Sequence, residues 1–412
     1  MNRHAGRSRL RSTFPWLLLP IVASGVAATQ APPGAPERPS IVAAVAAPAK
    51  AEPSSTQKPH GRYEDPLDGW FDYSEVLLFH RGFLPVPFLV TEPAVGYGGG
   101  VAAVWFRKSI AEMQQDSRAA GGRMLPPDVG ALMGYKTSNG TWGAGGGYFG
   151  SLAADRFRYS LLAAQTDTRL DFYGPREIPR RFDIEAPYVK ADALARLGGS
   201  DWFLGARYLY FGATSRFAGE VPEEIADREL ESDVGKLSLL VDFDTRDNVL
   251  TPSRGTFVEL DLGWARPELA SSESFQSWQG RGFTYLALGE RAVVGLRGDL
   301  RFTDGRAPFY AKPYLAMRGI AAMRYQGDDT ALAESELRWT PHPRWGVVVF
   351  GGVGRAWSDR LSFEDAETAF GGGAGFRYLI ARRLGLWAGV DLARGSGSND
   401  TALYFQVGSA WR

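Results

Sequence analysis

The stretch GKLSLLVDFD, residues 235–244, decides the fold, because its side chains alternate in character along the chain. Successive side chains of a β-strand point to opposite faces of a sheet, so this alternation is typical of a strand with two different surroundings. One face carries Leu237, Leu239, Val241 and Phe243, and the other carries Lys236, Ser238, Asp242 and Asp244. We therefore expect a strand with one apolar face and one largely polar face.

The same alternation recurs at 258–264 (VELDLGW), 293–302 (VVGLRGDLRF) and 331–339 (ALAESELRW). In each stretch, large apolar residues share one face and charged residues share the other. A soluble β-sandwich alternates in the same way, because one face of each sheet meets water. Alternation alone therefore leaves a soluble sandwich and a membrane barrel open, and the number and length of the strands must separate them.

Sixteen strands are predicted, and most exceed the roughly five or six residues usual in globular sheets. They cover residues 84–91, 95–107, 127–137, 140–150, 155–174, 184–198, 201–214, 233–246, 254–267, 274–288, 291–304, 329–340, 345–358, 368–380, 384–395 and 400–412. Most reach the roughly 9 to 11 residues that cross a bilayer as a tilted strand, and an even number places both chain ends on one side. We predict an all-β fold, a closed 16-stranded antiparallel transmembrane β-barrel of the outer membrane over residues 84–412.

The composition supports a barrel and excludes several classes of protein. The 412 residues include 50 glycines, and aromatic residues make up 13% of the chain, which suits closely packed strands with aromatic girdles. Lys plus Arg and Asp plus Glu both number 46, so the net charge indicates no nucleic acid partner. Without cysteine, the chain has no disulfide, thiol nucleophile or Cys-ligated metal.

Residues 1–28 are typical of a signal peptide. Arginines at positions 3, 7, 9 and 11 precede the apolar run FPWLLLPIVASGVAA (14–28), and small residues follow it. A retained membrane anchor is the alternative, but the run is short and contains Pro15 and Pro20. We therefore expect export to the outer membrane of a Gram-negative bacterium.

Two further segments precede the predicted barrel. Residues 29–62 are rich in Pro, Ala and Ser and are predicted to be a disordered linker. Residues 63–83 are predicted to form a short periplasmic pre-barrel segment, with a short helix that ends near Gly82.

The connections between strands alternate in length. The connections HPR (342–344), ARR (381–383) and GER (289–291) are short and basic, whereas those at 214–232, 304–328 and 359–367 are long. Short periplasmic turns and long external loops are typical of outer-membrane barrels. The connection at 107–126 departs from this pattern, because it is long on the side of the short turns.

The last predicted strand, ALYFQVGSAWR (402–412), resembles the terminal signal by which outer-membrane barrels are recognised by the barrel-assembly machinery. We expect Leu403, Phe405, Val407 and Trp411 to face outward, and Tyr404, Gln406 and Arg412 to face inward. Arg412 departs from the signal, since it follows the last aromatic residue. The expected partners of the chain are therefore this machinery and the outer-membrane lipid bilayer.

Residues 84–412 resemble the bacterial surface antigen family, the barrel domain of the outer-membrane assembly and translocation superfamily. Four pieces carry the resemblance: LPVPFLVTEPAVGYGGGVAAVWF (84–106), VDFDTRDNVLTPSRGTFVEL (241–260), MRGI (317–320) and ESELRW (334–339). The first is similar to the family's first strand pair and the second to a strand, turn and strand. MRGI resembles the conserved motif of the sixth external loop, and ESELRW resembles the strand after it.

The resemblance implies a role for the MRGI motif. In the family the sixth loop folds into the lumen, and its arginine contacts acidic residues of the wall. These features correspond to Arg318, followed by Gly319 and Ile320, with Glu336 as the expected partner. The family's second acidic partner is an Asp in a Phe-x-Asp-x-Gly motif, which is FGGVG here, with Gly352 at the Asp position. Asp328, Asp329 and Glu334 are the candidate substitutes, and a less firmly held loop is the alternative.

The resemblance also has a large departure. Family members that act as assembly factors carry periplasmic POTRA domains, and residues 29–83 are too few for one, so a POTRA-less member is expected. The phospholipases that share this barrel are excluded because no Gly-x-Ser-x-Gly elbow is present. His4, His60, His80 and His342 all precede the barrel or lie in a periplasmic turn, so no serine hydrolase site is expected.

The leading functional hypothesis is the assembly, insertion or translocation of protein or lipid at the outer membrane, through a seam between residues 84–91 and 401–412. A passive pore is one alternative. A surface-exposed structural or adhesive barrel, with the 214–232 loop as its contact region, is another. We expect a protein or lipid client, and no enzymatic activity, metal or cofactor. Arg297, Arg301 and Arg338 are expected to balance Asp299, Glu334 and Glu336 in a wet lumen.

Overall fold

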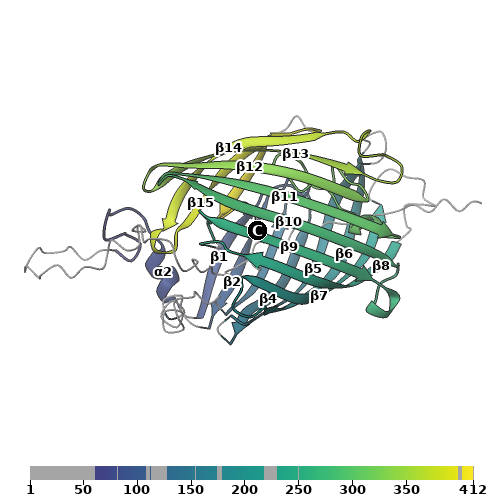
Figure 1. Ribbon diagram of the computed structural model, residues 1–412, viewed down its shortest axis with the longest axis horizontal. Coiled ribbons are helices and arrows are strands. Elements are labelled where there is room, and N and C mark those ends of the chain that lie inside the picture. The colour runs from purple at the N-terminus through teal and green to yellow at the C-terminus, as the bar shows by residue number, and fades with distance from the viewer. Residues whose placement is uncertain are drawn as a thin grey trace, which may run out of the picture.

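Sixteen strands form one antiparallel sheet that curves into a barrel, and neighbours in the sheet are neighbours in the sequence (Figure 1). The computed structural model describes residues 61–80, 82–107, 112, 128–153, 155–173, 179–217, 230–248, 250–397 and 401–411. The predicted signal peptide and nearly all of the predicted linker lie outside these residues. The fold class expected from the alternating stretches is confirmed.

The elements follow the chain in order. The strands are β1 (Gly82–Val90), β2 (Gly98–Phe106), β3 (Val129–Thr137), β4 (Trp142–Leu152), β5 (Phe157–Tyr173), β6 (Pro179–Arg196), β7 (Trp202–Phe217), β8 (Leu230–Asp244), β9 (Gly255–Ala265), β10 (Phe275–Leu288), β11 (Ala292–Gly305), β12 (Asp329–His342), β13 (Trp345–Trp357), β14 (Ala369–Ala381), β15 (Leu386–Gly395) and β16 (Ala402–Val407). The helix α2 (Ser74–Phe79) precedes β1, and the 3-10 turns are η2 (Pro267–Leu269), η3 (Phe309–Ala311) and η4 (Arg382–Leu384). No helix among the described residues is long and apolar enough to span a membrane.

The two faces of the strands have the predicted character. On β8, Leu237 and Leu239 are exposed on the outer face, at 43% and 40%, whereas Lys236 and Asp242 are buried on the lumen face. On β11, Leu296 and Leu300 are exposed and Asp299 is buried. Leucine exposed all around a barrel is stable only where lipid replaces water, so this outer face is the membrane-facing surface.

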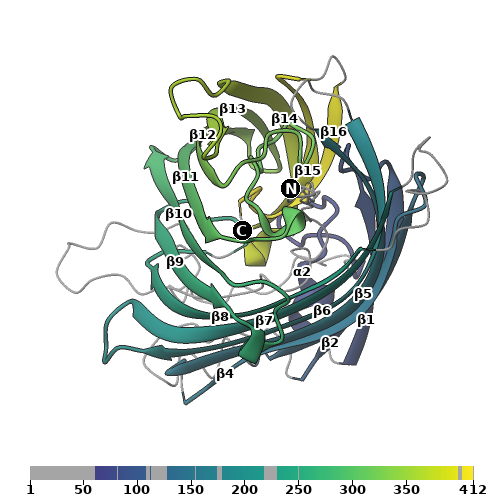
Figure 2. The same cartoon turned by 90° about the vertical axis from the view of Figure 1, so that its right-hand side faces the viewer.

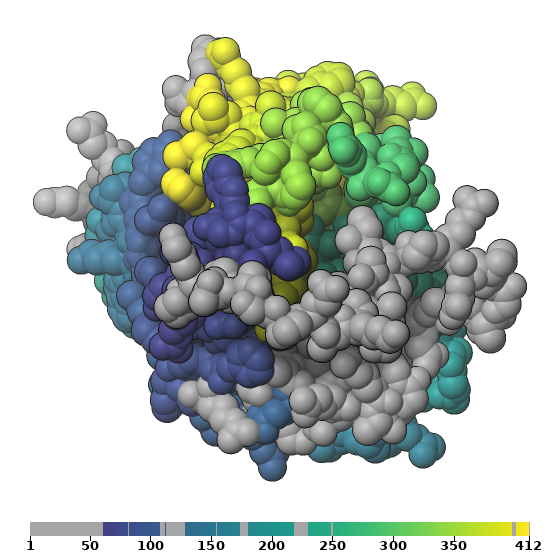
Figure 3. Space-filling model, turned by 90° about the vertical axis from the view of Figure 1, so that its left-hand side faces the viewer, coloured from purple at the N-terminus to yellow at the C-terminus, as the bar shows by residue number. Residues whose placement is uncertain are grey.

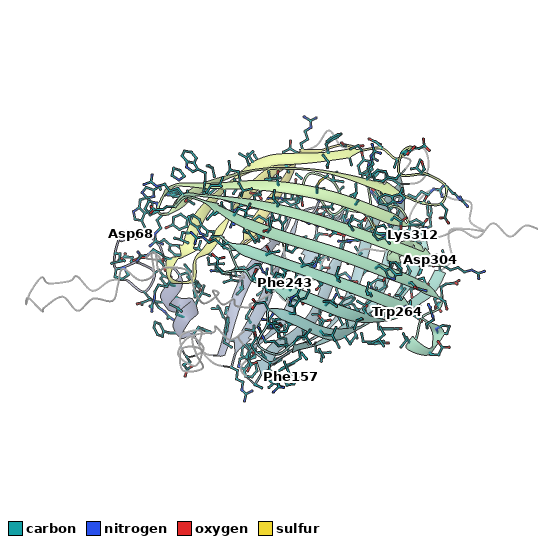
Figure 4. All side chains as sticks on the ribbon, in the orientation of Figure 1. Asp68, Phe157, Phe243, Trp264, Asp304 and Lys312 are labelled. Carbon is teal, nitrogen blue, oxygen red and sulfur yellow. The ribbon has the colours of Figure 1, made fainter. Side chains whose placement is uncertain are left out.

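Aromatic residues border the outer face near both rims. The rings of Trp202 and Phe243 pack with their centroids 4.8 Å apart, near the rim that carries α2 and the end of β16. Phe302 and Trp357 pack at 6.2 Å near the opposite rim. Figure 4 shows Asp68 at the first rim and Lys312 at the other. Because outer-membrane barrels keep both chain ends in the periplasm, we refer to the rim with α2 as the periplasmic rim and to the other as the external rim.

The barrel is not closed by hydrogen bonds, which corrects the expectation of a closed sheet. The sheet order begins with β1 and ends with β16, and no ladder joins these two strands in the part of the chain that the structure describes. We refer to the line between β1 and β16 as the seam. Pro85 and Pro87 lie in β1, and proline cannot donate a backbone hydrogen bond, which explains an unpaired edge at this strand.

Several predicted strand boundaries differ from the structure, and those at the two ends of the barrel matter most. The barrel begins at Gly82 rather than Leu84, because β1 extends almost to α2. The last strand ends at Val407 rather than Arg412. Gly408 has a φ of 79°, a left-handed conformation that glycine adopts without strain, and it turns the chain away from β16. Arg412 lies outside the described residues.

An outward leucine provides a test of the membrane-facing surface. Leu239→Arg is expected to lower the free energy of unfolding in lipid vesicles by about 2–4 kcal/mol, because the charge enters the hydrocarbon near mid-strand. Leu239→Ala, which keeps the position apolar, is the matched control. Its free energy of unfolding should fall much less. Both are measured by urea titration of the reconstituted barrel. Equal losses in the two variants would mean that this face does not contact lipid.

Candidate functional site: loop six and the seam

Residues 306–328, which we call loop six, connect β11 to β12 at the external rim and fold back into the barrel. Figure 2 looks along the barrel and shows the chain between β11 and β12 inside the ring of strands. Its apolar side chains, such as Phe309, Tyr314 and Met323, are buried against Phe172, Phe182 and other residues of the wall. Burial of these side chains stabilises the folded-back position, since an external loop would expose them to water. The upper lumen is therefore apolar and filled, rather than wet throughout.

Arg318 places a guanidinium among acidic residues in the middle of the lumen. The side chain is only 9% exposed. Its Nη2 donates to Oε2 of Glu336 on β12 at 2.7 Å, and its Nη1 donates to Oδ2 of Asp391 on β15 at 3.0 Å. The guanidinium also lies 3.5 Å from the ring centroid of Phe350 on β13. A buried guanidinium is stable only with partners of this kind, so the contacts hold loop six in place.

The contact predicted between Arg318 and Glu336 is present, but the second partner differs from the prediction. Asp391 takes that place, and it also accepts hydrogen bonds from Arg377. Glu334 lies 3.9 Å from Arg318 and pairs more closely with Arg297, at 2.5 Å. The hypotheses of Asp328 and Asp329 as partners are wrong, because Asp328 pairs with Lys312 and Asp329 lies at the start of β12, near the external rim. The alternation of LWAGVDLARG on β15 is the signal that could have placed Asp391 in the lumen.

Gly352, where the family resemblance implies an acidic residue, makes room for loop six. A Cβ at this position would lie 2.6 Å from Sδ of Met317 and 2.6 Å from Cγ of Glu334. On the next strand, a Cβ at Gly371 would lie 2.5 Å from the carbonyl oxygen of Arg318. Asp391 thus takes the place of the missing acid, and Met317 fills the space that Gly352 leaves.

Gly319 and Ile320 complete the motif. Gly319 has a φ of 90°, and a Cβ would lie 2.7 Å from the backbone carbonyl of Arg394 on β15, so only glycine fits there. Ile320 is buried and packs with Leu315 and Leu332. The predicted residues of the motif thus lie together, between loop six and the inner wall of β12–β15.

Loop six contacts both sides of the seam. The N–H of Gly319 donates to the hydroxyl of Tyr404 on β16 at 3.0 Å. Three residues later, the N–H of Ala322 donates to Oε1 of Glu92 at 3.2 Å, and Glu92 lies in the connection after β1. Burial raises the pKa of Glu92 to about 7. Because β1 and β16 share no ladder, these two contacts make loop six a bridge across the seam.

The chain end does not have the orientation expected of a terminal signal. Phe405 and Val407 are exposed on the outer face as predicted, and Leu403 is half-buried. Trp411, expected to face outward, is only 4% exposed and packs on Phe283 inside the barrel, with ring centroids 6.3 Å apart. The turn at Gly408 is the cause, since it directs Ser409 and Trp411 into the lumen, where Ser409 bonds to Tyr285.

Below loop six, paired charges cover the lumen wall. Arg207 on β7 contacts Asp192 and Asp261 at 2.8 Å each, and Glu259 at 3.4 Å. Arg297 and Arg301 both contact Asp299, and Arg338 lies 3.7 Å from Glu336. The predicted balance of lumen charges is confirmed. Among the described residues, no group of His, Asp and Glu could hold a metal ion.

A second arginine, Arg344 in the turn between β12 and β13, was missed as a functional residue because its turn was interpreted only as a basic connection. It is completely buried and contacts Asp65 at 2.5 Å, Asp68 at 2.6 Å and Asp72 at 2.7 Å. The hydrogen bond from Arg344 holds the pKa of Asp68 below its usual value. These contacts attach the pre-barrel segment, which Figure 3 shows in purple against the yellow C-terminal part of the barrel, to the periplasmic rim.

No protein-family model and no curated protein matches this sequence. Solved structures share its architecture at low identity. BamA from Haemophilus ducreyi lacking POTRA domains 1–3 matches with a TM-score of 0.53 and 12% identity, over 80% of this chain and 70% of that one. CdiB from Escherichia coli matches with a TM-score of 0.57 and 10% identity, over 78% of this chain and 61% of that one.

The chain has the fold of the outer-membrane assembly and translocation barrels. CdiB from Acinetobacter baumannii has the same fold, with a TM-score of 0.53 and 12% identity over 79% of this chain and 59% of that one. This chain therefore spans less than two thirds of either CdiB chain. The likeness to an assembly and translocation barrel concerns the fold, and the residues of loop six and the seam must carry any argument about function.

Adjacent glycines of β13 test the packing of loop six. Gly352→Ala should lower the free energy of unfolding by about 1–3 kcal/mol, because the new methyl group displaces Met317 or Glu334. Gly351→Ala is the matched control, since its Cβ would meet only a backbone oxygen at 3.8 Å. Urea unfolding of the reconstituted variants measures both. A smaller loss for Gly352→Ala than for Gly351→Ala would contradict the assigned packing.

Docking of loop six on Glu92 is expected to weaken as the pH rises through about 7. The docked carboxyl has a pKa of about 7 against an ordinary value of 4.5, so between these values the docked state keeps a proton that the released state has lost. The advantage of docking is complete below about pH 4.5 and is lost as the pH approaches 7.

A spin label on loop six can measure this change, because its own signal does not depend on pH. The natural chain has no cysteine, so a single introduced cysteine is the only labelling site. A label at Ala321→Cys should become more mobile between about pH 5 and 8. In the Glu92→Gln background the mobility should stay constant, because the amide accepts the same hydrogen bond but cannot ionise. The same pH dependence in both proteins would exclude Glu92 as the cause.

Proposed function

We propose that this protein assembles, inserts or translocates protein or lipid at the outer membrane, and that the client passes through the seam. The observation that carries the proposal is the position of loop six, held by Arg318 and bonded to Tyr404 on one side of the seam and Glu92 on the other. A barrel that acts only as a stable pore or structural protein would not need an unpaired seam that a loop bridges from inside.

The two edge strands differ in how readily they can move. The ladder between β15 and β16 joins six residue pairs, whereas the ladder between β1 and β2 joins nine. The shorter ladder makes β16 the edge that we expect to open. An extended client segment could then pair with a free edge by strand addition, which provides affinity through backbone hydrogen bonds and little sequence specificity.

A proposed working cycle follows from these contacts. Loop six releases Tyr404 and Glu92, the seam widens, a client strand pairs with an edge, and the client leaves sideways into the lipid or upward to the surface. The Arg318 contacts return loop six to its position afterwards. The two carboxylates that accept hydrogen bonds from Arg318 lie on different strands, Glu336 on β12 and Asp391 on β15, so a shift of β15 relative to β12 would loosen the site.

A passive pore is the weaker proposal, because several segments occupy the barrel. Loop six fills the upper lumen. Ser409 and Trp411, at the end of the chain, enter the lumen from the periplasmic side. The adhesive alternative depends on the loop at 214–232, most of which lies outside the described residues. We propose no enzymatic activity, and the two described histidines, His80 and His342, both lie at the periplasmic rim.

The test compares the outer-membrane protein and lipid composition of wild-type cells with that of a deletion strain carrying wild-type, Arg318→Ala or Arg318→Lys protein. We expect selective loss of one protein or lipid in the deletion strain, full restoration by wild type, none by Arg318→Ala and partial restoration by Arg318→Lys, which keeps the charge but not the paired donors.

Heat-modifiable migration on gels, compared with and without boiling, serves as the control that each variant barrel is folded and present. An unchanged membrane in the deletion strain would overturn the proposal, and single-channel conductance would then test the pore. Full restoration by folded Arg318→Ala would remove loop six from the mechanism.

A further inference from the structure

The pre-barrel segment exposes more apolar surface than a segment in aqueous periplasm should. Leu67 is 73% exposed, Phe79 58% and Phe71 52%. Tyr63 and Trp70 are exposed as well. Apolar residues gathered on a short segment indicate a binding surface, because scattered single residues would need no explanation but a cluster does.

Three acidic residues of the same segment contact the barrel, whereas Glu64 and Glu75 are exposed. Asp65, Asp68 and Asp72 all contact the buried Arg344, and Asp65 also contacts Arg382 in η4. The charges of these aspartates are thus balanced by Arg344 and Arg382, which lie in turns at the periplasmic rim. The segment therefore has its three aspartates paired with arginines at the barrel, and its large apolar side chains exposed.

The exposed aromatic residues continue the aromatic girdle of the barrel. Trp70 packs edge-on against Trp345 at 6.2 Å, and Trp345 stacks on Phe376 at 5.2 Å. The hydroxyl of Tyr378 donates to the carbonyl oxygen of Phe71 at 2.8 Å. Trp345, Phe376 and Tyr378 lie at the periplasmic ends of β13 and β14 on the outer face, since Arg377 between them is buried on the lumen face.

We propose that residues 63–79 bind the interface of the periplasmic leaflet, with Leu67, Trp70, Phe71 and Phe79 among the phospholipid headgroups and upper acyl chains. Phospholipid is the occupant because the surface extends a girdle that already meets lipid, and because tryptophan and tyrosine favour this depth of a membrane. The inference goes beyond the proposed function and does not depend on it.

This placement also bears on the seam. Ser74 at the start of α2 accepts a hydrogen bond from the N–H of Arg383 in η4, while α2 leads almost directly into β1. The segment therefore links the turn between β14 and β15 to β1. A lipid-bound segment would keep both sides of the seam at one depth in the membrane.

The test uses single cysteines, since the natural chain has none. Leu67→Cys, Glu290→Cys and Leu132→Cys are each labelled with a polarity-sensitive fluorophore, and the full chain is reconstituted in vesicles of phosphatidylethanolamine and phosphatidylglycerol, with or without brominated acyl chains. Leu132, exposed on the outer face of β3, is the lipid reference, and Glu290, exposed in the turn between β10 and β11, is the water reference at the same rim.

The proposal expects the bromine quenching at Leu67 to be at least about twofold that at Glu290 and closer to that at Leu132. Quenching at Leu67 equal to that at Glu290 overturns it. Shielding of the Leu67 probe only after addition of a periplasmic extract also overturns it, and would identify a protein as the occupant instead.

Discussion

A guanidinium taken out of water needs carboxylates around it, and the interior of this barrel is arranged to provide them for Arg318. Glu336 and Asp391 come from β12 and β15, and Phe350 on β13 supplies an aromatic face. The strands that carry these groups must keep their spacing for the charge to stay matched. The position of loop six, the filled upper lumen and the bridge across the seam all depend on this site. It supplies the buried ion pairs of the loop, beside the hydrogen bonds of Ala316, Gly319 and Ala322.

The seam between β1 and β16 is the second feature that distinguishes this barrel. In an ordinary barrel, closure removes the unpaired strand edges that would otherwise bind other chains. Here β1 carries two prolines and β16 is six residues long, so the two edges stay unpaired with each other, and side-chain contacts take over from backbone ladders. Loop six links the edges from inside the lumen. The pre-barrel segment, which leads into β1, is attached to the periplasmic rim through Arg344 and through the hydrogen bond between Ser74 and Arg383. Contacts of this kind can be broken one by one, whereas a ladder resists opening as a whole.

Prediction from the sequence succeeded where the physics is local. Alternation placed Glu334 and Glu336 in the lumen and Leu296 and Leu300 outside, since the direction of a side chain in a strand depends only on its position in the strand. It failed for Trp411, because Gly408 ends the last strand and the turn there directs Ser409 and Trp411 into the lumen. It also missed Asp391, which meets Arg318 across 73 residues of sequence, and Arg344, whose aspartates lie more than 270 residues earlier.

The sequence by itself therefore determined the strands, their faces and their order, because each depends on short-range patterns of polarity and turn residues. The inward loop motif was implied only by the resemblance of MRGI to a known family. Tertiary structure alone decided which acid completes the Arg318 site, that Gly352 is space for Met317 rather than a lost partner, and that the seam is unpaired. These are properties of side chains brought together by the curvature of the whole sheet, and that curvature sets the distance from one wall of the barrel to the other. No pattern within a single strand contains that distance.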